Sequence, residues 1–237
     1  MGLKPVFTHR WDLSPSEAIH LQQQMARRVV QQDQFGEINR IAACDVAFPQ
    51  NRACAAVCLF SYPQLKLLEQ KVVVEEVRFP YVPGLLSFRE TPPLLTAFAQ
   101  LKEEPDLLVV DGQGVAHPRR FGIASHIGVI LEKPTIGCAK SILFGKPTSE
   151  LGQKKGSKVN LVTEEGEVIG MLLRSKDGVE PLVISVGHRI SLESAVKFVE
   201  TLCGRYRIPD VQRIADSLSK GNITAGLSSR RDSKPLF

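Results

Sequence analysis

The chain has 237 residues, 43% of them hydrophobic, which is enough to bury one sizeable core and suits an ordinary soluble protein. The 30 Lys and Arg against 25 Asp and Glu give a formal net charge of +5, which suggests mild attraction to polyanions but also fits a solvated basic surface. No run reaches the roughly 18 uninterrupted apolar residues of a membrane span, so we expect no membrane partner. The N-terminus lacks a secretory signal, and the five cysteines show no C-x-x-C spacing. We therefore expect reduced thiols and a cytoplasmic or nuclear protein.

The first part of the chain predicts one helix followed by an antiparallel meander. Ser14 is a good N-cap, Pro15 suits the first helical position and Glu17 completes a capping box, so we expect a helix over residues 14–32. Three β-rich runs with short polar links follow, at 38–48, 53–61 and 66–77. Such close spacing predicts a three-stranded antiparallel meander.

After the meander, strands alternate with helices. Thr91 and Pro92 predict the start of a helix. The elements expected after it are strands at 106–111, 134–139, 157–163, 167–175 and 181–186, and helices at 121–131, from Ser191 to about Gly204, and at 209–219. This order is typical of an α/β protein with a ribonuclease H-like fold, in which helices flank a mixed central sheet made of the antiparallel meander and parallel strands. We expect one domain over residues 1–220 and a basic, polar, mobile tail over 221–237.

Two aspartates at apolar strands are the first candidates for chemistry. Asp45 lies inside the run 38–48, where strand propensity and the cost of burying charge both disfavour an acid, so it is either an edge carboxylate held by a hydrogen bond or a functional group. Asp111 ends the run LLVVD and either makes a simple Asp-Gly turn or lies at the ligand-binding carboxyl end of a parallel strand. If the two strands are neighbours, both carboxylates converge into a hard oxygen site suited to Mg²⁺ or Mn²⁺.

The other candidates carry more than one reading. Glu90 could turn toward the same site, but a Glu before a helix is usually solvated. Asp216 points roughly 150° away from the apolar stripe of the last helix, which a solvated face explains. The segment DGQGVAHPRRFG fails the G-x-G-x-x-G spacing because His117 takes the third glycine position, and neither a Walker motif, a nucleophile elbow nor a zinc spacing occurs. A carboxylate cluster is therefore the best-supported chemistry.

Five motifs follow one another in a fixed order. They are PYVPG at 80–84, FRE at 88–90, DGQGVAHPRRFGIASHIG at 111–128, GCAKS at 137–141 and VGHRISLE at 186–193. Together they resemble the endonuclease V family, and the similarity runs from the N-terminal helix to about Asp216, so that only the basic tail lies outside it.

The resemblance implies a set of active-site residues. The family's metal ligands correspond to Asp45, Glu90 and Asp111, and a fourth position on the closing helix corresponds to Asp216. Lys140 corresponds to a lysine that holds the scissile phosphate or orients water, although it could also be an ordinary lysine at a strand end.

The resemblance also implies a loop that enters nucleic acid beside the target base. Its prolines restrict the backbone while its aromatic ring stacks on bases. We call this loop the wedge; it comprises Pro80, Tyr81, Val82 and Pro83. Gly84 would let the backbone approach an extruded hypoxanthine, and His117 would contact a backbone phosphate. Without the resemblance, the same residues would be read as a surface turn and a loop histidine.

The function implied is that of a Mg²⁺-dependent endonuclease of DNA repair, with Mn²⁺ as a possible substitute. It would recognise inosine in DNA, with inosine in RNA as a second substrate, and hydrolyse the second phosphodiester bond on the 3′ side of inosine, leaving 3′-hydroxyl and 5′-phosphate ends. Two alternatives stay open: an inosine-specific endoribonuclease, and a non-catalytic module that binds deaminated or branched nucleic acid. We expect the protein to be a monomer.

Overall fold

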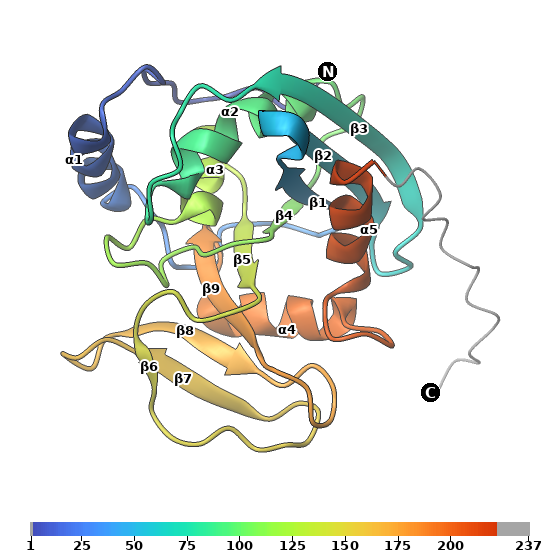
Figure 1. Ribbon diagram of the computed structural model, residues 1–237. Helices are drawn as coiled ribbons and strands as arrows, with labels where there is room; N and C mark the ends of the chain where they lie inside the picture. The colour runs from blue at the N-terminus through green and yellow to red at the C-terminus, as the bar shows by residue number, and fades with distance from the viewer. Residues whose placement is uncertain (1, 222–237) are drawn as a thin grey trace.

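The structure is a computed structural model that describes residues 2–221 (Figure 1). Its helices are α1 (Pro15–Ala26), α2 (Leu86–Ala99), α3 (Ile123–Leu131), α4 (Leu192–Leu202) and α5 (Asp210–Ser219), with a short 3-10 turn, η1 (Pro49–Asn51). Its strands are β1 (Arg40–Ala47), β2 (Arg52–Ser61), β3 (Leu67–Glu76), β4 (Leu107–Val110), β5 (Thr135–Ala139), β6 (Lys146–Pro147), β7 (Lys158–Val162), β8 (Val168–Leu173) and β9 (Leu182–His188). Of the predicted tail, residues 222–237 lie outside the described part of the chain.

All nine described strands form one mixed sheet in the order β3-β2-β1-β4-β5-β9-β8-β7-β6. The predicted meander is confirmed, because β1, β2 and β3 pair antiparallel. β1 pairs parallel with β4, and β4 pairs parallel with β5, while β9 and the remaining strands return antiparallel. The ribonuclease H-like fold class expected from the element order is therefore confirmed, and β1 and β4 are the neighbours that the convergence of Asp45 and Asp111 requires.

Helices cover both faces of the sheet and bury two separate apolar layers (Figure 1). Alternate residues of β1 serve the two layers, since Ile41 and Ala43 pack with α4 and α5, whereas Ala42 and Cys44 pack with α2 and α3. All five cysteines are buried free thiols, as expected of packing residues. No helix within residues 2–221 is long and apolar enough to cross a membrane.

The first helix ends sooner than its sequence predicts, at Ala26 instead of residue 32. Its beginning is as expected, with Ser14 and Glu17 forming a complete capping box. Beyond the helix the backbone pairs with the turn after β9: the Val30 N–H donates to His188 Nδ1 at 3.2 Å, and the Val30 carbonyl accepts from the Arg189 N–H. These distant partners replace the hydrogen bonds that would have continued the helix.

The prediction that a helix starts at Thr91 is wrong, because α2 begins at Leu86. Buried Leu85 and Phe88 pack with Phe79 and fix the first turn of the helix, so that Pro92 lies within it. Glu90 therefore projects from inside α2 instead of preceding it.

Candidate active site

Asp45 projects from an interior strand toward α5. It shares the face of β1 that carries Ile41 and Ala43, and it is half-buried. The interpretation as an edge carboxylate is wrong, because β1 lies between β2 and β4. A hydrogen bond does hold it, since the buried Ser219 hydroxyl at the end of α5 donates to Asp45 Oδ2 at 2.5 Å.

Three aspartates from distant parts of the chain converge at the carboxyl ends of β1 and β4. Cys44 of β1 is in register with Val110 of β4, so Asp45 and Asp111 each follow the last paired position. α5 packs on β1 through its apolar stripe and turns Asp216 into the same place instead of toward bulk solvent. One carboxylate oxygen each of Asp45, Asp111 and Asp216 lies within 4.8 Å of the others.

Glu90 lies near Asp45 and Asp111 but does not belong to the group of three carboxylates. Burial, and after it the negative charges of Asp45 and Asp111, raise the pKa of Glu90 to about 8. The structure thus brings three of the four predicted carboxylates together, namely Asp45, Asp111 and Asp216. Glu90 is a neighbouring carboxyl group whose pKa is affected by the charges of Asp45 and Asp111.

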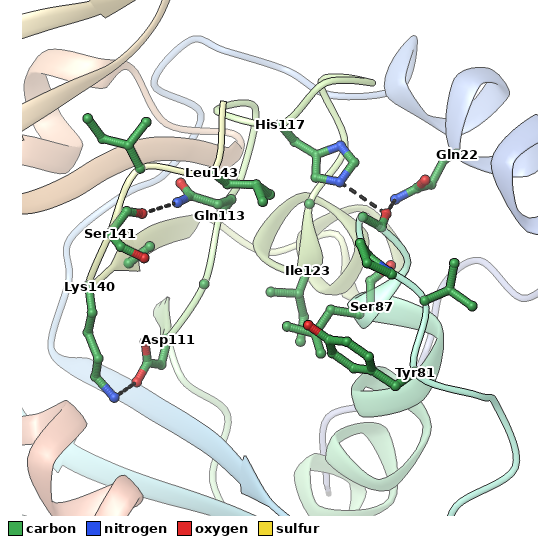
Figure 2. Close-up of a pocket in the computed structure, with 18 residues that line it drawn as sticks. Gln22, Tyr81, Ser87, Asp111, Gln113, His117, Ile123, Lys140, Ser141 and Leu143 are labelled. Atoms are coloured by element: carbon green, nitrogen blue, oxygen red, sulfur yellow. Dashed lines mark hydrogen bonds and ion pairs between the residues drawn. The ribbon is translucent and has the colours of Figure 1, made fainter. Parts of the chain in front are cut away.

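Two lysines partly neutralise the cluster. Lys140, just after β5, places Nζ 2.5 Å from Asp111 Oδ2 (Figure 2). The same Nζ lies 3.3 Å from Asp216 Oδ1, and Lys220 places Nζ 2.7 Å from Asp216 Oδ2. Burial opposes the charge of Lys140, but the ion pairs with Asp111 and Asp216 raise its pKa. The pKa of Asp111 is raised because burial outweighs the contact with Lys140. That of Asp216 is lowered, since its contacts with Lys220 and Lys140 outweigh burial.

The donor set fits a hard divalent cation. Mg²⁺ takes oxygen ligands at about 2.1 Å, so two ligands are about 3 Å apart when adjacent and about 4.2 Å apart when opposite. The three aspartate oxygens, which lie within 4.8 Å of one another, are close enough together to share one such ion. Burial, together with the negative charges of Asp45 and Asp111, raises the pKa of Glu90 to about 8, and a bound cation would neutralise these charges.

A cavity of about 370 Å³ opens beside the cluster (Figure 2). Asp111 and Lys140 line one side of it, and Tyr81 and Ile123 line another. The loop before α2 contributes four lining residues, which are Tyr81, Val82, Pro83 and Gly84, whereas Pro80 is an exposed neighbour. The Tyr81 side chain is free to contact a ligand, because the residue is 72% exposed.

A buried polar network fixes the position of Gly84. Its carbonyl oxygen accepts hydrogen bonds from Gln22 Nε2 at 3.1 Å, His117 Nε2 at 3.1 Å and Arg119 Nη2 at 2.7 Å. Gly84 has a φ of +77°, a conformation that strains any other residue, and a Cβ there would lie 2.7 Å from Arg119 Nη2 and push this guanidinium aside.

His117 is part of this network and stays neutral. Its Nδ1 accepts the Arg119 backbone N–H at 3.1 Å, so the ring proton is on Nε2 and points to Gly84. Burial, helped by the charge of Arg119, lowers the pKa of His117 to about 4. The phosphate contact implied for His117 stays a prediction, but both ring nitrogens already have protein partners.

Several polar residues of the site have no sequence signal. Ser87 and Gln113 line the cavity and are 2% and 7% exposed. Ser87 Oγ and Gln113 Oε1 have no hydrogen-bond partner among the described residues. Gln22 and Ser219 read as ordinary helix residues. Their roles depend on contacts with residues far away in the chain, which periodicity does not reveal.

The mixed sheet, the convergent carboxylates and the adjoining cavity define a nuclease of the ribonuclease H-like class. The family model for endonuclease V matches residues 23–217. Endonuclease V of Gloeobacter violaceus is 46% identical over 215 residues, which are 89% of this chain and 87% of the relative. The chain belongs to the endonuclease V family.

Solved structures of endonuclease V proteins have the same fold as this chain. The crystal structure of endonuclease V from Streptomyces avermitilis has a TM-score of 0.84 and 37% identity, with 93% of this chain and 96% of that chain covered. A Ciona intestinalis endonuclease V, in complex with a 24mer DNA containing an inosine followed by a ribo-adenosine, has a TM-score of 0.75 and 28% identity, with 86% and 95% covered.

Proposed function

We propose that the protein is a metal-dependent endonuclease that recognises inosine in nucleic acid and cleaves the strand on its 3′ side. The observation that carries this proposal is the carboxylate cluster beside a cavity lined by the wedge. The inosine-containing DNA bound by the Ciona relative supports the choice of base.

In this proposal, Asp45, Glu90 and Asp111 hold Mg²⁺ or Mn²⁺, and Asp216 completes the set from α5. When bound, the cation supplies charge stabilisation at the reacting phosphate and lowers the pKa of water for in-line attack. Ser219 keeps one oxygen of Asp45 occupied and so orients the other toward the cluster. Lys140 is partly exposed beside Asp111, within reach of a phosphate that enters the cluster.

The cavity receives the extruded base. Tyr81 is exposed at its rim and stacks on a neighbouring base, while Pro80 and Pro83 limit the motion of the loop. The network around Gly84 holds this loop against α1 and the segment before α3. Tyr81 and Lys140 line different sides of the cavity, so base and scissile phosphate occupy different places. Incision at the second phosphodiester, with 3′-hydroxyl and 5′-phosphate products, is what the membership of the endonuclease V family implies. Such a nick would initiate repair and leave base removal to other enzymes.

An inosine-specific endoribonuclease is the second candidate. The DNA in the Ciona complex has a ribose directly after the inosine, so a 2′-hydroxyl is accepted at that position by that relative. A non-catalytic binding module is the third outcome that the test can give. The carboxylate cluster around Asp45 argues against it, because a module that only binds nucleic acid does not need such a cluster.

The test uses matched DNA and RNA strands, each with one inosine or one adenosine, incubated with Mg²⁺, Mn²⁺ or EDTA. We compare the wild type with Asp45→Ala and with Glu164→Gln, a control in the exposed turn between β7 and β8. We expect metal-dependent cleavage of inosine strands by the wild type and the control, and none by Asp45→Ala. Inosine-selective binding without cleavage under all conditions would contradict the nuclease proposal and favour a binding module. The ratio of rates on RNA and DNA decides between the two sugars.

A further inference from the structure

An exposed basic and aromatic surface follows α5 beyond the carboxylate cluster. We call it the α5 ridge; it comprises Arg205, Tyr206, Arg213 and Lys220, all of them exposed. Tyr206 is 46% exposed, with Arg213 Cζ 3.6 Å and Arg205 Cζ 5.9 Å from the centroid of its ring. Stacking between guanidinium and ring fixes these side chains in advance, which lowers the entropic cost of binding a ligand.

The loop that carries Tyr206 is anchored beside Lys140. Arg207 Nη2 donates to the Lys140 carbonyl at 2.5 Å and to the Pro181 carbonyl at 2.9 Å, while its Nε donates to the Glu180 carbonyl at 2.7 Å. The guanidinium of Arg207 is thus used to hold the loop against the end of β5, and the neighbouring Tyr206 is left to face outward.

The ridge adjoins the cluster directly. Arg213 and Asp216 of α5 and Lys220 at its C-cap follow one another at spacings of three and four residues, so they lie along one face of the helix. Lys220 contacts Asp216 at 2.7 Å, and Asp216 contacts Lys140 at 3.3 Å. The carboxylate of Asp216 therefore has a cation on either side along the helix.

The existing ion pairs leave the ridge able to bind anions. Arg213 contacts Asp210 at 3.6 Å, but the Arg213 side chain is 41% exposed, and exposed ion pairs of this kind contribute little. Lys220 is 55% exposed. A phosphate can thus approach both cations from solvent.

The ridge and the wedge lie on opposite sides of the cluster. The wedge precedes α2, which covers one face of the sheet, whereas α5 covers the other, as Figure 1 shows. A strand whose base enters the cavity beside Tyr81 and whose phosphate reaches Asp111 and Lys140 continues toward Asp216 and the ridge.

We propose that the α5 ridge binds the single strand that leaves the active site on the 3′ side of the scissile bond, with Arg213 and Lys220 on its phosphates and Tyr206 against a base. This inference rests on the proposed function for the direction of the strand. A stacking ring and flanking cations bind a strand with little sequence preference.

The experiment measures affinity by fluorescence anisotropy in EDTA, so that its result does not depend on cleavage. Two inosine-containing strands are compared, one ending a single nucleotide beyond the proposed cut and one extending several nucleotides further in the 3′ direction. The test variants are Tyr206→Ala and Arg213→Ala, which are compared with the wild type. Two variants serve as controls: Tyr206→Phe, which keeps the ring, and Lys154→Ala, at a lysine whose side chain is 87% exposed.

We expect the alanine variants at Tyr206 and Arg213 to bind the long strand about tenfold more weakly than the wild type, and the short strand equally well. Tyr206→Phe and Lys154→Ala should match the wild type on both strands. An equal loss on both strands, or no loss on the long one, would overturn the inference. If the wild type binds as expected but never cleaves when metal is restored, the proposed nuclease function fails. The affinities measured in EDTA still test the ridge in that case, because they do not depend on cleavage.

Discussion

Replacing His117 with Gln should remove a specific source of acid sensitivity. Neutral His117 is buried against Gly84 and has a pKa of about 4, whereas an unfolded histidine titrates near 6.5. The unfolded chain therefore binds the proton more readily, and stability falls as the pH drops from 6.5 toward 4. The full loss is about 3 kcal/mol, of which about 1.3 kcal/mol appears between pH 7.5 and pH 5.5. Gln can still donate to the Gly84 carbonyl but does not titrate.

The assay is urea unfolding of the wild type and His117→Gln at pH 7.5, 6.5 and 5.5, without metal. Because the substitution also alters packing, we compare the change in unfolding free energy with pH in each protein, not the absolute values. Between pH 7.5 and pH 5.5 the unfolding free energy of His117→Gln should fall by about 1.3 kcal/mol less than that of the wild type. Since all other titrating groups are common to both proteins, they cancel in the comparison. Parallel curves would refute the reasoning and show that His117 is protonated in the folded protein without cost.

Four further predictions concern the cluster and the sheet. Ser219→Ala should weaken Mn²⁺ binding by roughly 10- to 100-fold in calorimetry, because Asp45 loses its hydrogen-bond donor, whereas Ser217→Ala on the same helix should not. Saturating Mn²⁺ should raise the thermal midpoint of the wild type but not that of Asp45→Ala. Lys140→Met should retain Mn²⁺ binding while cleavage falls about 100-fold, and a lost metal site would contradict a role at the phosphate. Gly114→Ala should cost about 3 kcal/mol of unfolding free energy in urea, since its Cβ would lie 1.9 Å from a carbonyl oxygen of β9; a change below about 0.5 kcal/mol would contradict this packing argument.

Local signals were sufficient for much of the fold. The capping box at Ser14 correctly predicted the start of the first helix, and the close spacing of the next strands correctly predicted the meander. From the sequence, the pairing of β1 with β4 was only a condition for the convergence of Asp45 and Asp111, and the structure fulfils it. Their neighbourhood then placed Asp45 and Asp111 together, because both follow the last paired residues of adjacent parallel strands.

What the sequence left open depends on contacts between distant segments. The start of α2 is set by packing of Leu85 and Phe88 on Phe79, which outweighs the helix-start signal at Thr91. The helical phase placed Asp216 opposite the apolar stripe, but phase alone does not tell whether that side meets water or the end of a sheet.

The order of these elements along the chain has a consequence for synthesis. β1, α2 and β4 leave the ribosome well before α5, which supplies both the third aspartate of the cluster and the hydroxyl that orients Asp45. A nascent chain that ends before α5 therefore lacks one aspartate of the cluster and the hydrogen bond to Asp45. If the proposed function holds, such a chain should cleave nucleic acid far more slowly than the finished protein.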